Sequence, residues 1–423
     1  MAQRTRYAAR TSFVFCALLL VTAAPLRQVP VTTALWAGPA ILVAAMLIAW
    51  GAESAQFFVA QGFALAILAW LQTLPEFAVE AVLAWKRQGP LLMANLTGAL
   101  RLLIGIGWPM IYATAALAHR AKCGKPLRQI RLAKQHSVEV VGLLAPLPYF
   151  VFIWWKGSLN VLDSIVLAAL YFIYLAILSK MPPEDEEAIE ELEAIPRAIV
   201  KARRPVRIAA ITLCFVAGGA VIYLVAEPFL GSLLAISAAL GVPSFVCIQW
   251  VAPFVSEFPE MTSTFYWART VHRAPMALMN IASSNINQWT LLAAMLPVLY
   301  SISAGAPTPI VFDKQQELEL LMTLGQSLVA MLFLINMELA WHEALSIGVL
   351  FGIQFVLSPV PPGPGFWGSL AQHIHYWVTG VYFIWFAFGL GSYLLRRRKL
   401  EAFGCFAEMW RQHVWPSSAP AVK

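Results

Sequence analysis

The sequence predicts an all-α polytopic membrane protein with about twelve transmembrane helices. Of its 423 residues, 60% are apolar and only 12% are charged, and the mean hydropathy is +0.70. Soluble domains carry about 25% charged residues, so this chain has too little polar surface to cover a water-soluble globule. Long apolar segments recur along the chain, and its two halves carry matching polar motifs inside those segments.

The apolar segments are interpreted in chain order as membrane spans of about 20 residues. A first candidate at 12–26 follows three arginines, like a signal sequence, but has no clean cleavage site and is predicted to be a retained helix. Further spans of the first half are expected at 38–60, 62–85, 91–117, 138–155 and 159–179. Those of the second half are expected at 206–239, 242–268, 276–302, 318–338, 342–359 and 373–395.

Positive charge sets the expected orientation. Segment 119–136 holds six lysines and arginines and no acid, and such basic loops face the cytoplasm. Counting spans from this segment places both termini, the 180–205 linker and the Arg269–Arg273 loop in the cytoplasm as well. Lys86 and Arg87 fall on the outer side and are a small exception to the rule that basic residues face the cytoplasm. The expected location is therefore the bacterial inner membrane, with both termini cytoplasmic.

On this count the chain has five parts. Residues 31–180 and 206–360 form two halves, and the linker 181–205 connects them. Residues 1–30 and 361–423 each add a helix, the second with a basic tail. The acids of the linker precede a basic run, which is typical of a solvated charged helix. A regulatory calcium strip is the alternative, although acids without turn glycines do not make a calcium loop.

Several classes of site are not expected. The five cysteines form neither a disulfide framework nor a metal-spaced cluster. His373 and His375 are interpreted as a juxtamembrane pair, with a metal site as the alternative. No zinc motif, Ser/His pairing or phosphate loop points to an enzyme. The net charge of +7 belongs to cytoplasmic loops, so lipid is expected as a partner and nucleic acid is not. The oligomeric state stays open.

The two halves repeat a polar pattern of Ala-Glu, then Pro-Glu, then Asn. Glu76 precedes Asn95 by 19 residues, and Glu260 precedes Asn280 by 20 residues. The span count places the first of these loops outside and the second inside. The two copies are thus predicted to be inverted, as in transporters whose binding site lies at the midplane of the membrane.

Each Pro-Glu helix carries a stripe of two carboxylates and a hydroxyl. Spacings of three and four residues put these groups on one helical face, and the stripes are Thr73, Glu76 and Glu80, and Glu257, Glu260 and Thr264. A charge at the centre of a membrane helix costs at least about 2.5–3.5 kcal/mol. Four such carboxylates therefore require cations or protons.

Proline precedes the central glutamate in both halves. Pro75 and Pro259 remove a backbone N–H, so carbonyl oxygens near Leu71 and Val255 are expected to be free. Free carbonyls beside carboxylates are the hard ligands that Ca²⁺ or Na⁺ prefers. A purely structural kink is the alternative for a single Pro-Glu, but matching pairs in two halves favour a binding site.

Asn95 and Asn280 open the partner helices and offer amide oxygens at the same depth. Asn280 is followed by Ser283, Ser284 and Asn285, so this face is polar enough to line a pathway. The asparagines could instead bridge helices. The two Ala-Glu carboxylates are interpreted as peripheral pathway residues or as polar contacts at helix ends: Glu53 and Glu227.

These repeats resemble the alpha repeats of the cation/calcium exchanger superfamily, the membrane domain of sodium–calcium exchangers. In the first half the motifs are Gly51-Ala52-Glu53, Gln72-Thr73-Leu74-Pro75-Glu76, and Asn95 with Gly98. In the second half they are Ala226-Glu227, Ser256-Glu257-Phe258-Pro259-Glu260, and Asn280 with Ser284-Asn285. The resemblance covers about residues 38–360. It implies two inverted five-helix repeats, with one added helix at each end.

The resemblance also implies a function. Ca²⁺ would lie between Glu76 and Glu260, with Na⁺ sites made by hydroxyls, amides and backbone carbonyls nearby. Transport would proceed by alternating access, with a two-helix gate sliding against the core, and no cofactor besides the transported ions. The candidate cation-binding residues are Glu76, Glu260, Asn95, Asn280, Thr73, Glu80, Ser256, Glu257, Ser284 and Asn285.

This chain departs from the family pattern in ways that bear on the coupling ion. Ala99 and Leu100 replace Ser-Asn, and Arg101 follows inside the span. Glu80 and Glu257 stand where small polar residues are usual. If Arg101 faces four glutamates around one Ca²⁺, a charge of −1 remains, which one proton would cancel. The hypothesis is therefore exchange of the cation against H⁺, with Na⁺ as the other candidate.

Arg101 has two further interpretations. It could form a structural ion pair, for which Glu80 is the expected partner. It could also be a fixed plug in a degenerate exchanger that no longer cycles and serves as a membrane scaffold or cation sensor.

Overall fold

The computed structural model describes residues 29–58, 73–181, 189, 192–360, 363–395 and 400–415. Nearly all of these residues are helical, which confirms the predicted all-α class. The expected span at 12–26, most acids of the linker and the basic run 396–399 lie outside the described residues.

The helices of the first half follow the predicted spans. They are η1 (Val31–Thr33), α2 (Ala34–Ala55), η2 (Gln56–Phe58), α4 (Leu74–Trp85), α5 (Gly89–Leu102), η3 (Leu103–Gly107), α6 (Trp108–Cys123), η4 (Lys134–His136), α7 (Ser137–Leu144), α8 (Leu147–Lys156) and α9 (Val161–Leu178). The π turn η3 joins α5 and α6 into one long run, and the predicted span at 138–155 is divided between α7 and α8.

The second half begins after a short helix of the linker. Its helices are α10 (Ala194–Lys201), α11 (Arg204–Leu240), α12 (Ser244–Ser256), α13 (Phe258–Ala268), η6 (Val271–Arg273), α14 (Ala274–Asn287), η7 (Gln288–Leu292), α15 (Ala293–Ala304), α16 (Lys314–Leu334), α17 (Trp341–Leu357), α18 (Phe366–Leu394), α19 (Glu401–Met409) and η8 (Trp410–Val414). The predicted span at 242–268 is two helices, α12 and α13, and α19 was not predicted.

Local sequence signals fix where several helices stop and start. Gly157 ends α8 in the left-handed conformation, with φ of +66°, which glycine adopts without steric cost. Asn160 then begins α9, because its side chain accepts hydrogen bonds from the backbone N–H groups of Leu162 and Asp163. Asp163 returns a bond to the N–H of Asn160, which completes a capping box.

Two short strand pairs tie the loops together. β1 (Gln129–Arg131) pairs antiparallel with β4 (Glu338–Ala340), and β2 (Ser158–Leu159) pairs antiparallel with β3 (Ile310–Val311). The span count puts the loops of β1 and β4 on one side of the membrane and those of β2 and β3 on the other. Both pairings therefore agree with that count.

Seven helical runs in the described part of the chain are long and apolar enough to cross a bilayer, and they are Val31–Ala55, Gly89–Cys123, Lys134–Lys156, Val161–Leu178, Arg204–Leu240, Lys314–Leu334 and Phe366–Leu394. Two shorter apolar helices are α12 and α17. Large apolar side chains point outward from these runs, such as Phe388, which is 76% exposed. Such outward apolar surface suits lipid and confirms an integral membrane protein. The number twelve stays a prediction.

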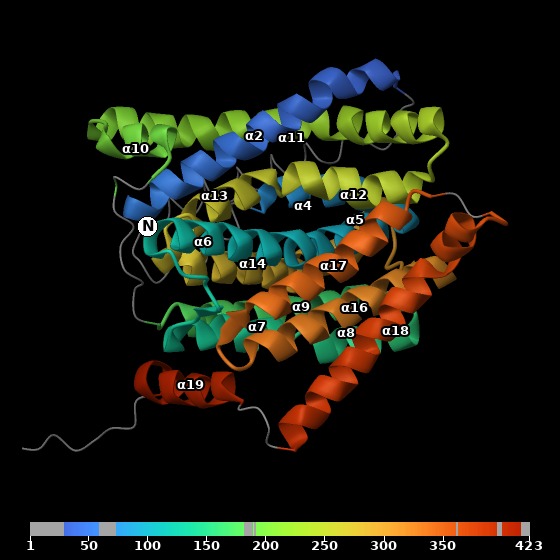
Figure 1. Cartoon of the computed structure of the whole chain (residues 1–423). Coiled ribbons are helices and arrows are strands. Elements are labelled where there is room, and N and C mark those ends of the chain that lie inside the picture. Colours follow the sequence, from blue (N-terminus) through green and yellow to red (C-terminus); the bar gives the residue numbers. More distant parts are fainter. Residues whose placement is uncertain are drawn as a thin grey trace, which may run out of the picture.

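The helices form layers (Figure 1). α2 lies across α11 at one edge of the bundle, and these two helices pack mainly against each other. Small residues allow the close approach: a side chain added at Gly218 would meet Ile48 Cγ1 at 2.8 Å. α4, α5, α13 and α14 occupy the middle, and α7, α8, α9 and α16 lie beyond them.

Helices of the middle layer approach their neighbours closely at two glycines. Gly98 of α5 lies directly against the backbone carbonyl of Gln249 on α12, where any side chain would overlap the carbonyl. Gly105 likewise lies against the ring of Phe351 on α17. These contacts fix α5 against its neighbours and leave its polar face toward α4, where the candidate site lies.

Candidate functional site

Both Pro-Glu motifs lie at the start of a helix. Glu76 is in the first turn of α4, with Pro75 just before it, and Glu260 is in the first turn of α13, with Pro259 just before it. Proline is tolerated there because the first N–H groups of a helix have no partner within the helix. The kink expected at Pro259 is a full break at Glu257, between α12 and α13. Leu71 lies outside the described residues.

In the first half, one asparagine binds two carboxylates. Asn95 Nδ2 donates to Glu76 Oε1 at 2.8 Å and to Glu80 Oε1 at 2.9 Å. All three side chains are at most 1% exposed. The structure therefore brings together three of the predicted site residues, from α4 and α5.

In the second half, the matching asparagine binds the matching glutamate. Asn280 Nδ2 donates to Glu260 Oε1 at 3.1 Å, and Ser284 Oγ donates to the same oxygen at 2.5 Å. Thr264 does not reach a carboxylate, because its hydroxyl bonds the backbone carbonyl of Glu260. The pairing of Pro-Glu with Asn is thus the same in both halves, which the sequence repeat anticipated.

Two contacts join the halves. Ser256, at the end of α12, donates a hydrogen bond to Glu76 Oε2, so each oxygen of Glu76 is held by a different half. Asn287 of α14 donates to the hydroxyl of Thr73 at the start of α4. The residues of both stripes therefore lie in one polar region at the middle of the bundle.

Glu257 lies at the break between α12 and α13. Gln288 Nε2 donates to Glu257 Oε1 at 2.5 Å. Glu260 lies three residues further along the same stripe, so the two carboxyl groups are neighbours on one helical face. Two neighbouring buried carboxylates repel each other when both are ionised, which favours the uptake of a proton or a cation.

Several oxygens of this region are buried and have no hydrogen-bond donor among the residues that the structure describes. They are Glu80 Oε2, Asn95 Oδ1, Glu260 Oε2, Asn285 Oδ1, Asn287 Oδ1 and Gln288 Oε1. Asn285 directs its amide N–H to the carbonyl of Leu100. Buried polar atoms normally have partners, and carboxylate and amide oxygens are the ligands that hard cations prefer. This set of oxygens could serve as ligands of a dehydrated cation.

The acids alone do not form a metal centre. Within the described ranges, no three His, Cys, Asp or Glu side chains converge in a geometry that could hold a metal ion. A cation at this place would therefore need amide and hydroxyl oxygens beside the carboxylates. The predicted sharing of one Ca²⁺ by Glu76 and Glu260 stays a prediction.

Arg101 does not pair with Glu80, as one interpretation expected. Its Nη2 lies 2.5 Å from Glu319 Oε2 on α16, and both side chains are at most 1% exposed. Its Nε donates to the carbonyl of Thr97, and its guanidinium lies over the ring of Trp250. The reason is geometric: Arg101 leaves α5 toward α12 and α16, whereas Asn95 faces α4. Arg101 therefore forms a structural ion pair.

The remaining predicted residues have simple roles. Glu227 pairs with Lys86, their charged atoms 3.3 Å apart, which neutralises the lysine that violated the orientation rule. Glu53 is buried on α2 and has an interaction partner. His373 and His375 do not share a metal: His373 bonds the carbonyl of Ser369, and His375 faces Glu319.

Sequence reasoning missed Glu319, Gln249, Asn287 and Gln288. Asn287 and Gln288 lie two and three residues after the predicted Asn285, so extending the polar segment by one turn would have found them. Gln249 lies alone in an apolar run, which was a usable signal. Glu319 follows Gln315, Gln316 and Glu317 in a short polar stretch at a helix start, which is typical of surface residues.

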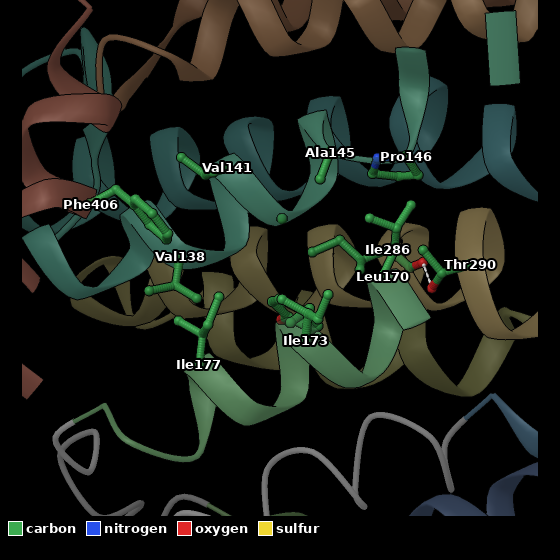
Figure 2. Close-up of a pocket in the computed structure, with 12 residues that line it drawn as sticks. Val138, Val141, Ala145, Pro146, Leu170, Ile173, Ile177, Ile286, Thr290 and Phe406 are labelled. Carbon is green, nitrogen blue, oxygen red and sulfur yellow. Dashed lines mark hydrogen bonds between the residues drawn. The ribbon is translucent and has the colours of Figure 1, made fainter. Parts of the chain in front are cut away.

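A pocket elsewhere in the bundle is apolar and is not a cation site (Figure 2). It lies between α7, α9 and α14, and Phe406 of α19 reaches its edge. The hydroxyl of Thr290 in this pocket is bonded to the carbonyl of Ile286. The hydroxyl of Tyr174, which also lines the pocket, is hydrogen-bonded to that of Ser283. The rest of the lining is apolar and offers no ligand to a cation.

Comparison with known proteins identifies a family. The family described as sodium/calcium exchanger protein matches residues 29–180 and 210–359, one match in each half. No curated protein matches the chain in sequence.

Solved structures are similar over most of the chain. The crystal structure of the H⁺/Ca²⁺ exchanger CAX is 30% identical, with a TM-score of 0.79, covering 90% of this chain and 92% of that one. The sodium–calcium exchanger NCX_Mj, soaked with 10 mM Na⁺ and zero Ca²⁺, is 18% identical, with a TM-score of 0.50, covering 77% of this chain and 97% of that one. The second likeness concerns the fold alone.

Proposed function

We propose that this chain, which belongs to the sodium/calcium exchanger family, is a secondary antiporter that exchanges an inorganic cation, Ca²⁺ in the first place, against H⁺. Na⁺ is the other candidate for the coupling ion. Members of this family are transporters, and the chain is an integral membrane protein. The choice of ions is the proposal.

The observation that carries the proposal is the set of four buried glutamates with amide partners at two helix starts. Glu76 and Glu80 share Asn95, and Glu260 is bound by Asn280. Four ionised carboxylates in a bilayer core are not tolerated without positive charge. The amide oxygens beside them that lack donors supply the remaining ligands for a cation.

Charge favours protons as the counter-ions. Arg101 is balanced by Glu319, so it does not offset the four glutamates as the earlier arithmetic assumed. Their charge of −4 then exceeds one Ca²⁺ by −2, which two protons would cancel. The 30% identical H⁺/Ca²⁺ exchanger CAX supports the same pair of ions.

In this mechanism the cation and the protons occupy the carboxylates in turn. When the cation leaves, protons take its place and the region becomes neutral enough to reorient within the membrane. α2 and α11 are the helices proposed to move, because they pack chiefly against each other across small residues. The two halves act as inverted five-helix repeats that expose the site to each side alternately.

The proposed location is the bacterial inner membrane with both termini in the cytoplasm. The basic segment 119–136 supports this orientation. β1, which lies in this segment, pairs with β4. α19 packs beside η4, which lies in the same segment, so α19 is at the same end of the molecule as the basic segment.

Vesicle transport decides the coupling ion. Purified protein reconstituted in liposomes is given a pH gradient without Na⁺, then a Na⁺ gradient without a pH gradient, with a panel of cations. We expect Ca²⁺ uptake driven by the pH gradient alone. Strict dependence on Na⁺ with no response to pH would contradict the proton version. Ca²⁺ binding without flux under either gradient would favour a non-cycling sensor instead.

A further inference from the structure

A second buried polar cluster lies outside the cation site. Its members come from four helices: Arg101 of α5, Gln249 of α12, Glu319 of α16 and His375 of α18. The first three are completely buried, and the side chain of His375 is 19% exposed. The exchange reaction as proposed above uses none of them.

Glu319 is the centre of the cluster. Its Oε2 faces Arg101 Nη2 at 2.5 Å and accepts from Gln249 Nε2 at 2.8 Å. Its Oε1 faces His375 Nδ1 at 2.9 Å. One carboxylate thus connects α16 with three other helices.

Arg101 and its surroundings fix α5 against α12. The guanidinium lies 5.2 Å from the centre of the Trp250 ring on α12. Gln326 of α16 donates to the backbone carbonyl of Arg101 at 3.1 Å. Gly98, one turn before Arg101, lies against the carbonyl of Gln249. The distance between α5 and α12 therefore depends on this cluster.

Both helices also carry cation-site residues. Asn95 lies six residues before Arg101 on α5, and Ser256 lies seven residues after Gln249 on α12. These two side chains hold the two oxygens of Glu76 from opposite halves. A change in the spacing of α5 and α12 would move both partners of Glu76.

We propose that Glu319 is a positioning residue for the cation site, which sets the spacing of α5 and α12, and that His375 makes this positioning sensitive to pH. The inference rests on the proposed function, because cation affinity is its readout.

The pH sensitivity follows from what faces His375. Glu319 faces it from α16, with Arg101 of α5 behind that carboxylate. The hydroxyl of Ser358, just after α17, lies 3.3 Å from Nε2. On α18, Tyr382 lies near Arg101, and His373 bonds its own helix. From α12 only the uncharged Gln249 and Trp250 reach the cluster.

Imidazole changes charge between about pH 5 and 8. A neutral ring can donate one hydrogen bond to Glu319. The protonated ring adds the attraction between two opposite charges to this hydrogen bond. Acidification therefore strengthens the contact of α18 with Glu319 and stabilises the spacing of the site helices.

The first test removes both charges of the pair. The double variant Arg101→Met, Glu319→Gln keeps side-chain length and leaves no unpaired buried charge. We expect it to fold with a Tm near that of the wild type but to bind Ca²⁺ about tenfold more weakly, as is usual when a positioning partner of a ligand is lost. Ca²⁺-dependent thermal stabilisation measures the affinity without transport. Wild-type affinity in the double variant would overturn the proposal.

Gln249→Met gives an independent measurement if the double variant does not fold. It keeps the ion pair and removes only the bond from α12 to Glu319. We expect an affinity about threefold weaker, since one hydrogen bond to Glu319 is lost while its ion pair with Arg101 remains. Unchanged affinity in this folded variant would contradict the positioning role.

The second test compares His375→Gln with His373→Gln. Glutamine at 375 can donate to Glu319 but cannot become charged. We expect its Ca²⁺ affinity to equal that of the wild type at about pH 8 and to fall below it at about pH 5. His373→Gln should follow the wild type throughout. Coincident curves for His375→Gln and wild type, or equal shifts in both variants, would overturn the pH role. A wild type that binds no cation at all would refute the proposed function itself.

Discussion

The molecule buries charge in two regions, and they differ in how that charge is balanced. Around Glu76 and Glu260, four carboxylates are held by neutral amides and hydroxyls, and neighbouring amide oxygens have no donor. In the second region, the carboxylate of Glu319 contacts one guanidinium and one imidazole, and it accepts a hydrogen bond from a glutamine.

The difference separates a binding site from a structural element. A fixed ion pair satisfies its own charge and needs nothing from the solution. A group of carboxylates with only neutral partners is stable only when it takes up cations or protons. Burial of acids alone therefore does not distinguish the proposed cation site; the missing positive charge does.

Removing one carboxylate from each region should change stability in opposite directions. Glu319→Gln leaves Arg101 buried without a counter-charge, which costs about 3–5 kcal/mol of unfolding free energy. Glu80→Gln removes an unbalanced acid and should raise the unfolding free energy by about 1–3 kcal/mol at pH 8 without cations.

Thermal unfolding in detergent measures both variants. The sign of the change in unfolding free energy matters more than its size, because a general packing defect would destabilise both variants. Destabilisation by Glu80→Gln equal to that by Glu319→Gln would show that the two regions do not differ as described.

Neutralising either Pro-Glu carboxylate should stop transport. Glu76→Gln and Glu260→Gln keep the hydrogen-bonding shape but remove a charged ligand, so we expect Ca²⁺ uptake to fall by about 100-fold or more. The matched control is Glu401→Gln, an exposed acid at the start of α19. Uptake within a factor of about two of the wild type in either site variant would remove these glutamates from the site.

The close contact between the two regions can be disturbed directly. Gly98→Ala would overlap the carbonyl of Gln249 and push α5 away from α12. We expect a loss of about 1–3 kcal/mol of unfolding free energy, together with weaker cation binding.

Gly219→Ala on α11 is the control, because nothing lies within 4 Å of the added carbon. That variant should be as stable as the wild type or slightly more stable, since alanine favours a helix. Equal losses for the two glycines would mean that the α5–α12 contact has no special importance.

The smallest effect is expected at α19. Lys134 Nζ lies 2.9 Å from Glu408 Oε2 on the surface, and the hydrogen bond from Lys134 lowers the pKa of Glu408. Because the pKa of Glu408 is lowered, the contact stabilises the docking of α19 at pH values above the ordinary carboxyl pKa. This stabilisation is lost as the pH falls through the lowered pKa. The same bond raises the pKa of Lys134, so at alkaline pH the contact is lost only as pH passes that raised value.

Glu408→Gln should therefore loosen α19 only slightly at neutral pH. Hydrogen exchange of the α19 amides measures this docking. Phe406 still contacts the apolar pocket of Figure 2 and keeps the helix in place. Complete release of α19 in this variant would show that the surface pair, rather than the apolar contact, holds it.

The sequence was more informative about the proposed cation region than about the region around Glu319. The repeated motifs picked out Glu76, Asn95, Glu260 and Asn280, and the structure brings each Glu together with its Asn. That these residues bind a cation stays a prediction. The predicted ends of most helices also agree with the structure, since apolar runs and capping residues set them locally.

Long-range partners could not be predicted in this way. Arg101 and Glu319 are 218 residues apart and have no repeated motif, so the sequence offered Glu80 as the nearest acid. The break at Glu257 was also missed, because a proline signals a kink but not how far the helix continues. Pairing across the bundle depends on how whole helices pack.

Proton release upon cation binding tests the central claim most directly. Ca²⁺ is added to detergent-solubilised protein in weakly buffered, Na⁺-free solution near pH 7, and the change in pH is recorded. The account predicts that the wild type releases protons as it binds Ca²⁺ and that the double variant Glu76→Gln, Glu260→Gln does neither. Ca²⁺ binding by the wild type without proton release would contradict exchange of the two ions at the same carboxylates.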